Sequence, residues 1–273
     1  MNGYLFKNLE TERKYCENGY LILPPISFKA VEKLCDLYYA FCSEIVHEDG
    51  QIYYSMFHNP VHINVQISNE IQNILKIELQ EHFRDIRFFA GMFLVKNTGK
   101  SILNLHQDWS YVYESKTPIT TLWIPLQETL SCNGAMIVAQ STHLLINNIR
   151  SGSFPSCRIG PNDYIISRLQ TVELAIGQPL AFHPALLHGS HANYKKAPRV
   201  VAAILIMPEN VNPMYFHKLD DKTAGSFLLD EESFFREIYW LSKGENPRNL
   251  IQLHSINYTH VVPTVEQISK YLS

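Results

Sequence analysis

The spacing of apolar residues in the first third of the chain predicts helices. A helix is expected from Ser27, a suitable N-cap, to the turn at Asp49-Gly50, because apolar residues recur there every three or four positions. Residues 67–83 show the same period and predict a second helix. Residues 21–23 are expected to form a short strand. We expect both helical faces to pack in the core.

From about residue 87 the pattern changes to short apolar segments separated by turns, which is typical of strands. Strands are predicted over residues 88–95, 119–126, 135–138, 171–174, 179–182 and 199–207. Asn133-Gly134 favours a tight turn, so the strands at 119–126 and 135–138 are expected to form a hairpin. Residues 147–168 are polar, with Gly, Pro and Ser, and predict a long surface loop.

These elements suggest one domain with three parts. They are a helical preface over about 1–85, a β core over about 87–207 and a C-terminal helical extension over about 210–273. In the extension, Asp230 is a suitable N-cap for a helix that reaches about Leu241. The fold class is therefore mainly β with flanking helices, a cupin-like double-stranded β-helix or jelly roll.

Composition narrows the class of protein. The net charge of -3 and the pI near 6.5, without a long basic run, argue against a nucleic-acid partner. The five cysteines are scattered without a C-x-x-C motif, which is typical of reduced thiols in a cytoplasmic protein. No apolar run reaches the ~18 residues of a membrane span. Composition gives no indication of the oligomeric state.

The candidate chemistry centres on His106 and Asp108. Residues two apart on a strand point to the same side, so an imidazole and a carboxylate would lie together. His188 follows Asp108 by 80 residues, and Arg199 follows His188 by eleven. Two histidines and one carboxylate are the facial triad that holds non-haem Fe(II). The pair alone has a simpler explanation, a histidine hydrogen-bonded to its neighbouring carboxylate.

Several motifs in the same order resemble a known family. They are the opening at 17–24, His106-Gln107-Asp108-Trp109, Trp123-Ile124-Pro125-Leu126 with Asn133-Gly134, and His188-Gly189-Ser190 with Asn193 and Arg199. With them the sequence resembles the phytanoyl-CoA dioxygenase family of Fe(II)- and 2-oxoglutarate-dependent oxygenases over most of its length. The family's usual Pro-Gly-Ser-His turn is replaced by residues 139–143, which leaves the role of His143 open.

The resemblance implies a cofactor set and a reaction. Fe(II) would be held by His106, Asp108 and His188, with O2 and the co-substrate 2-oxoglutarate in the remaining positions. Arg199 would bind the distal carboxylate of 2-oxoglutarate, because a guanidinium matches a carboxylate with two donors. Lys96 and Thr121 are further candidates for co-substrate binding.

The expected reaction is hydroxylation of an unactivated C–H bond in a small or carrier-tethered metabolite, with release of succinate and CO2. Asp108, where a halogenase would have Ala or Gly, favours an oxygenase. His183 and His191 compete with His188 for the metal, and we prefer His188 because Gly-Ser follows it and Arg199 has the family's spacing.

Substrate contacts are expected near the metal and on loops. The candidates are Trp109, Tyr111, Tyr113, the segment 53–58 with Met56 and His58, His183, and the arginines Arg150 and Arg158, which would suit an anionic substrate. Ordinary core packing explains an aromatic stripe equally well, and solvated surface explains loop arginines.

Other functions compete with hydroxylation. The same iron chemistry can end in desaturation, epoxidation or cyclisation. A cupin-like binding protein without catalysis is a second alternative. A zinc hydrolase is a third, since Zn(II) also binds two histidines and a carboxylate, but no H-E-x-x-H motif supplies its general base.

Overall fold

The computed structural model describes residues 4–42, 52–145, 148–155 and 163–272. The helices are α1 (Leu9–Asn18), α2 (Phe28–Phe41), α3 (Val61–Leu79), α4 (Asp163–Ile166), α5 (Glu231–Ser242) and α6 (Val265–Leu272), with short 3-10 helices η1 (Ser55–Phe57) and η2 (Thr142–Leu144). None of these helices combines the length and the apolar character that crossing a bilayer requires.

The strands form antiparallel sheets. The major sheet has the order β1 (Tyr20–Ile22), β8 (Leu180–Phe182), β5 (Thr120–Pro125), β10 (Arg199–Pro208), β3 (Ile86–Lys96) and β2 (Ile52–Tyr54). The minor sheet has the order β4 (Leu103–His106), β9 (His188–Ser190), β6 (Met136–Ala139) and β7 (Leu169–Val172). A third sheet consists of β11 (Met214–Lys218), β12 (Thr223–Leu228) and β13 (Gln252–Asn257).

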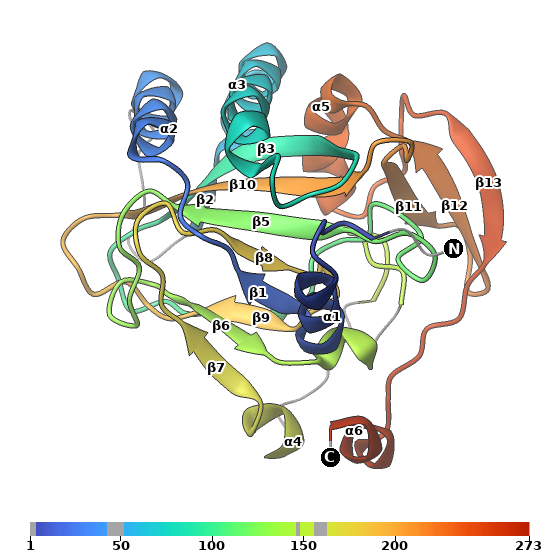
Figure 1. The fold of residues 1–273 in the computed structure, drawn as a ribbon. Helices are drawn as coiled ribbons and strands as arrows, with labels where there is room; N and C mark the ends of the chain where they lie inside the picture. Colours follow the sequence, from blue (N-terminus) through green and yellow to red (C-terminus); the bar gives the residue numbers. More distant parts are fainter. Residues whose placement is uncertain (1–3, 43–51, 146–147, 156–162, 273) are drawn as a thin grey trace.

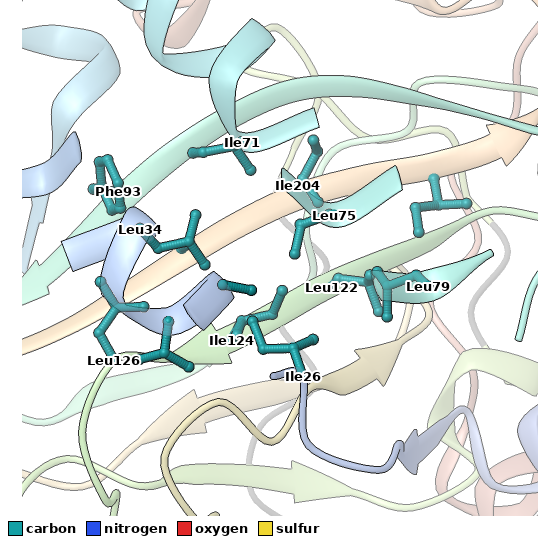
Figure 2. Close-up of a cluster of buried hydrophobic side chains, with 14 of the residues drawn as sticks. Ile26, Leu34, Ile71, Leu75, Leu79, Phe93, Leu122, Ile124, Leu126 and Ile204 are labelled. Atoms are coloured by element: carbon teal, nitrogen blue, oxygen red, sulfur yellow. The ribbon is translucent and has the colours of Figure 1, made fainter. Parts of the chain in front are cut away.

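The major and minor sheets face one another, and helices α2 and α3 cover the outer face of the major sheet (Figure 1). Apolar residues of α2 and α3 pack there on β5 and β10, as Figure 2 shows for Leu34, Leu75, Leu122 and Ile204. A second apolar cluster lies between the two sheets and includes Trp123, Val138 and Phe182. This is the jelly roll that the strand pattern predicted.

The helix N-termini follow the predicted capping residues. The Ser27 hydroxyl accepts a hydrogen bond from Ala30 N at 3.2 Å, so α2 begins as expected, while its expected end at Asp49-Gly50 lies outside the described residues. Asp230 forms a capping box with Ser233 and opens α5. Helix α3 begins at Val61, earlier than expected, directly after Pro60, a residue that is tolerated where a helix starts.

The predicted hairpin at Asn133-Gly134 is wrong. β5 pairs with β8 and β10 in the major sheet, whereas β6 pairs with β7 and β9 in the minor sheet. The turn itself exists, because Gly134 has φ +91° and the Asn133 side chain accepts from Leu130 N at 2.6 Å. It connects two sheets of the jelly roll and not two neighbouring strands.

Two of the three predicted parts also need correction. In the preface, β1 confirms the short strand expected at 21–23, but β2 was not predicted. These two strands complete both edges of the major sheet. The C-terminal extension is not purely helical, because β11, β12 and β13 form the third sheet. Strand β13 is largely exposed and therefore lacks the apolar alternation that identifies a strand. Within the predicted loop at 147–168, residues 163–166 form α4 and the remaining described residues are irregular.

Candidate metal and co-substrate site

Strand pairing brings the two predicted histidines together. β4 ends at His106 and β9 begins at His188, and the register of these strands places the two residues opposite one another. Their ring centroids lie 4.3 Å apart. Asp108 follows two residues after the end of β4, and its carboxylate reaches the same point. One carboxylate oxygen, Oδ1, lies 4.0 Å from His106 Nε2 and 3.6 Å from His188 Nε2.

Backbone carbonyls orient both imidazoles. Nδ1 of His106 lies 2.9 Å from Asn104 O, and Nδ1 of His188 lies 2.9 Å from Leu186 O. A carbonyl can only accept, so each Nδ1 carries a proton, and Nε2 is the nitrogen that each ring would present to a metal. Burial first, and then His106, lower the pKa of His188 to about 4. His188 is therefore neutral at physiological pH, the form that binds a metal.

The three side chains together can hold a divalent metal. One donor atom from each of His106, Asp108 and His188 lies within 4.8 Å of the others. Two imidazoles and one carboxylate are the donor set of the facial triad of non-haem iron, which would leave other coordination positions open. The donor set therefore fits Fe(II).

Asp108 is held through its backbone by two partners distant in the sequence. Its N–H donates to Pro184 O at 2.8 Å, and its carbonyl accepts from Arg150 Nε at 2.7 Å. Thr121 Oγ1 lies at 3.5 Å from the carboxylate atom Oδ2. These contacts fix the segment after β4, where regular strand pairing has ended.

The structure does not support Arg150 as a binder of an anionic substrate. Its Nη2 makes hydrogen bonds of 2.6 and 2.7 Å to the two carboxylate oxygens of Glu114, and Nη1 donates to Asn148 O at 2.6 Å. Both side chains of this ion pair are buried. Arg150 therefore supports the backbone of Asp108, and its charge is already paired. Arg158 lies outside the described residues.

Arg199 begins β10 and lies in the same cavity as the metal-binding side chains. Its side chain is buried, and its guanidinium carbon lies 4.8 Å from the ring centroid of Trp123. Nε and Nη1 have no hydrogen-bond partner among the described residues. A buried guanidinium with two unused donors fits the distal carboxylate of 2-oxoglutarate.

Lys96 adds a second buried cation behind Arg199. The two residues are paired across β3 and β10, and Lys96 Nζ donates to Ser190 Oγ at 2.9 Å. Burial first, and then Arg199, lower the pKa of Lys96 to about 8. Lys96 does not line the cavity, but Ser190 does. Lys96 therefore acts on a bound ligand indirectly. Its charge adds to the positive potential beside Arg199, and its hydrogen bond orients the Ser190 hydroxyl, which lines the cavity.

A cavity of about 390 Å³ connects these groups. One end holds the three donor residues together with Arg199, Trp123 and Thr121. The other end, which we call the apolar chamber, is lined by Met56, Phe57, Met92, Trp109, Tyr111 and Ile238. The chamber residues pack on a different hydrophobic cluster from Trp123, so the two ends are built on separate parts of the core.

Among the predicted substrate residues, Met56, Trp109 and Tyr111 reach the cavity and others do not. His58 is exposed and its ring lies 4.0 Å from that of Tyr53. Tyr113 packs in the core, with its ring 5.1 Å from that of Phe216.

His183 points away from the cavity. Its Nδ1 accepts from Ala185 N at 3.0 Å, and its ring centroid lies 5.2 Å from that of His143. Burial first, and then Arg150, lower the pKa of His183 to about 3. His191 lies near the surface and contacts Thr171 Oγ1 at 2.8 Å. Neither competes with His188 in the described geometry.

Sequence reasoning gave no role to Met92 and named Tyr54 only as a member of the candidate segment 53–58. Tyr54 ends β2 and lines the cavity, where burial first, and then the charge of Asp108, raise its pKa to about 12. Met92 lies on β3 beside the apolar chamber. The apolar character of β3 predicted a strand but could not tell which face of that strand borders a ligand.

Comparison with protein families decides the identity. The model of the phytanoyl-CoA dioxygenase (PhyH) family matches residues 15–201, more than half of the chain. The chain belongs to this family. It is thus an Fe(II)- and 2-oxoglutarate-dependent non-haem dioxygenase, and its cofactor set comprises Fe(II), 2-oxoglutarate and O2. No curated protein matches the chain closely enough to refine this assignment.

Solved structures of similar fold include enzymes with the same co-substrate. The epimerase SnoN in complex with Fe3+, alpha ketoglutarate and nogalamycin RO gives a TM-score of 0.54 at 19% identity over 74% of this chain and 83% of that chain. The non-haem monooxygenase ThoJ gives 0.56 at 14% identity over 85% and 94%. HygX from Streptomyces hygroscopicus with nickel, 2-oxoglutarate and hygromycin B gives 0.50 at 15% over 74% and 88%. At these identities the similarity shows the shared fold.

Proposed function

We propose that this dioxygenase hydroxylates an unactivated C–H bond of a small or carrier-tethered metabolite, with His106, Asp108 and His188 as the iron ligands and Arg199 as the anchor of 2-oxoglutarate. The observation that carries the proposal is the buried Arg199 guanidinium, which has unused donors in the same cavity as a His-Asp-His donor set. Burial of an unpaired cation costs free energy, which an anionic ligand would offset.

Different side chains have different roles in the proposed reaction. Fe(II), 2-oxoglutarate and O2, when bound, supply the oxidising chemistry and release succinate and CO2. The imidazoles of His106 and His188 and the carboxylate of Asp108 would hold the ion. Arg199 fixes the orientation of the co-substrate, and the apolar chamber holds the substrate and excludes water.

A different outcome from the same iron is the second candidate. Solved structures of similar fold include an epimerase and the carbocyclase SnoK, which has a TM-score of 0.50, so one scaffold supports several outcomes after the first oxidation step. Desaturation, epoxidation or cyclisation therefore competes with hydroxylation. The complete donor set beside Arg199 argues against a non-catalytic binding protein. The location in the cytoplasm stays a prediction.

Anaerobic titration with Fe(II) and then 2-oxoglutarate tests the assignment of the site. The visible charge-transfer band of the chelate is expected in the wild type and absent in Asp108→Ala. Arg199→Met should form the band only at roughly 100-fold higher 2-oxoglutarate, because it removes two charge-assisted hydrogen bonds. Arg84→Met, which changes an exposed arginine, is the matched control.

Two results would contradict the assignment. Iron that binds without responding to 2-oxoglutarate would exclude this mechanism. A normal titration in Arg199→Met would show that another group anchors the co-substrate. With the band established, succinate release during aerobic turnover identifies substrates, and product mass separates hydroxylation from desaturation.

A further inference from the structure

The apolar chamber offers no charged partner to a substrate. Among the described residues that line the cavity, the ionisable side chains other than tyrosine are His106, Asp108, His188 and Arg199, all at the metal and co-substrate end. Thioether, aromatic and aliphatic groups line the chamber itself, and its polar groups are the uncharged hydroxyl of Tyr111 and the indole N–H of Trp109. A charged group that entered it would lose its hydration without gaining a partner, which costs several kcal/mol.

The charged residues Glu114, Arg150 and Glu231 do not line the cavity. The Glu114 carboxylate receives two hydrogen bonds from Arg150 and does not line the cavity. The carboxylate of Glu231, at the start of α5, accepts from Ala90 N and from Gln72 Nε2, both through Oε1. Its Oε2 has no hydrogen-bond partner among the described residues, but Glu231 does not line the cavity. Neither acid is placed to bind a substrate amine, and Arg150 is not placed to bind a substrate carboxylate or phosphate.

The walls of the chamber combine fixed and adaptable side chains. The Tyr111 ring packs against the rings of Phe89 and Phe234, at centroid distances of 6.1 and 5.9 Å. The Trp109 ring lies 5.9 Å from that of Tyr215. Met56 and Met92 are half-buried and unbranched, so they can adjust to the outline of an apolar ligand. This combination favours hydrocarbon surface over hydrogen-bonding groups.

Helix α5 closes the chamber on one side. It lies beside α3 and contacts β3 and η1 (Figure 1). Ile238 of this helix lines the cavity and packs in the same cluster as Met92 and Trp109. The chamber is thus assembled from segments that contribute no metal-binding side chain, apart from the short stretch after β4.

We propose that the chamber binds an uncharged, hydrocarbon-rich part of the substrate, and that any charged group or carrier stays outside the cavity. This inference rests on the proposed function and specifies its substrate class. The cavity of about 390 Å³ lies near the lower end of ligand-binding sites and also has to hold 2-oxoglutarate. Only the reacting part of a large substrate therefore enters.

Binding of three probes with one carbon frame tests the proposal. They are 1-adamantanemethanol, 1-adamantanecarboxylate and 1-adamantanemethylammonium. Affinities are measured in the anaerobic Fe(II) and 2-oxoglutarate complex from the shift of the charge-transfer band. They are also measured in metal-free protein by tryptophan fluorescence, because Trp109 and Trp123 line the cavity. We expect the alcohol to bind roughly tenfold or more tightly than either ion.

A charge introduced into the chamber should reverse this preference. Met56→Lys should bind the carboxylate more tightly than the alcohol, and Met92→Lys provides the same test on another element. Ile77→Lys, at a position 69% exposed on α3, is the control and should leave the order unchanged.

The two readouts separate this proposal from the proposed function. Equal or tighter binding of an ion by the wild type overturns the uncharged substrate class, even if the charge-transfer band is normal. Absence of the band with normal fluorescence titrations overturns the cofactor assignment and leaves the chamber proposal supported. Unchanged preferences in both lysine variants would show that the probes bind elsewhere, which also overturns it.

Discussion

Replacement of Lys96 by methionine should stabilise the protein when 2-oxoglutarate is absent. Burial and the neighbouring Arg199 lower the pKa of Lys96 from 10.5 to about 8. Each pKa unit corresponds to about 1.4 kcal/mol, so the protonated lysine costs the folded state about 3 kcal/mol at pH 7. Loss of the hydrogen bond to Ser190 removes about 1 kcal/mol. We therefore expect a net gain of about 2 kcal/mol in the free energy of unfolding.

The gain should depend on pH in a defined direction. The folded-state pKa of Lys96 lies below its unfolded value, so the cost is complete below about pH 8 and disappears as the pH rises to 10.5. The stability difference between Lys96→Met and the wild type should shrink over this window. Urea denaturation at several pH values, with chelator and without 2-oxoglutarate, measures it. Lys100→Met, at an exposed position close to the end of β3, is the control.

The same substitution should weaken co-substrate binding. Removal of one buried positive charge near Arg199 lowers the attraction for the 2-oxoglutarate dianion by roughly tenfold in affinity. Lys96→Met should thus be more stable alone and less stabilised by 2-oxoglutarate. A variant that is less stable than the wild type at pH 7, with the pH dependence of Lys100→Met, would refute the argument that the lysine is buried without compensation.

Three further changes probe other parts of the site. His188→Ala should lose the charge-transfer band while His183→Ala keeps it, because His183 faces away from the cavity; the opposite result would mean that the wrong histidine was chosen. Glu114→Gln should lower the free energy of unfolding, measured by urea denaturation, by about 3 kcal/mol and weaken Fe(II) binding, because the Arg150 cation would lose its buried partner. An unchanged iron titration would show that Arg150 does not position Asp108. Gly134→Ala should lower both stability and 2-oxoglutarate affinity, because Gly134 has φ +91° and an added Cβ would lie 2.9 Å from Lys96 Cδ. Normal affinity would show that this turn does not shape the co-substrate site.

Local signals in the sequence predicted the parts of the fold that depend on nearby residues. The caps at Ser27 and Asp230 act within one helical turn, and their structures agree with the predictions. The central strands β5 and β10 are buried, with apolar residues that mark them. In contrast, the Asn133-Gly134 turn identified a tight bend but not the sheet that the next strand joins, because sheet assignment depends on long-range pairing.

The candidate site shows the same division between local and long-range information. His106 and Asp108 are close in the sequence, and their proximity was predicted from strand geometry, although Asp108 lies beyond the strand end and is held by Pro184 and Arg150. The selection of His188 over His183 came from the family resemblance. Arg150 was misassigned because a buried ion pair with Glu114 looks, in the sequence, like two isolated charges.

The division of the cavity into a charged end and an apolar end has a consequence for substrate scope. The co-substrate end depends on Arg199 and Lys96, which are paired residues of the neighbouring strands β10 and β3. The chamber depends on η1, on α5, on Met92 of β3 and on the stretch after β4 that carries Trp109 and Tyr111. Only the stretch after β4 also supplies a proposed metal ligand, Asp108. Substitutions at Met56, Met92 or Ile238 can therefore alter which hydrocarbon is accepted while the iron and 2-oxoglutarate positions stay intact. Since only differential contacts with the substrate change selectivity, the chamber is where members of this fold can diverge without losing the shared chemistry.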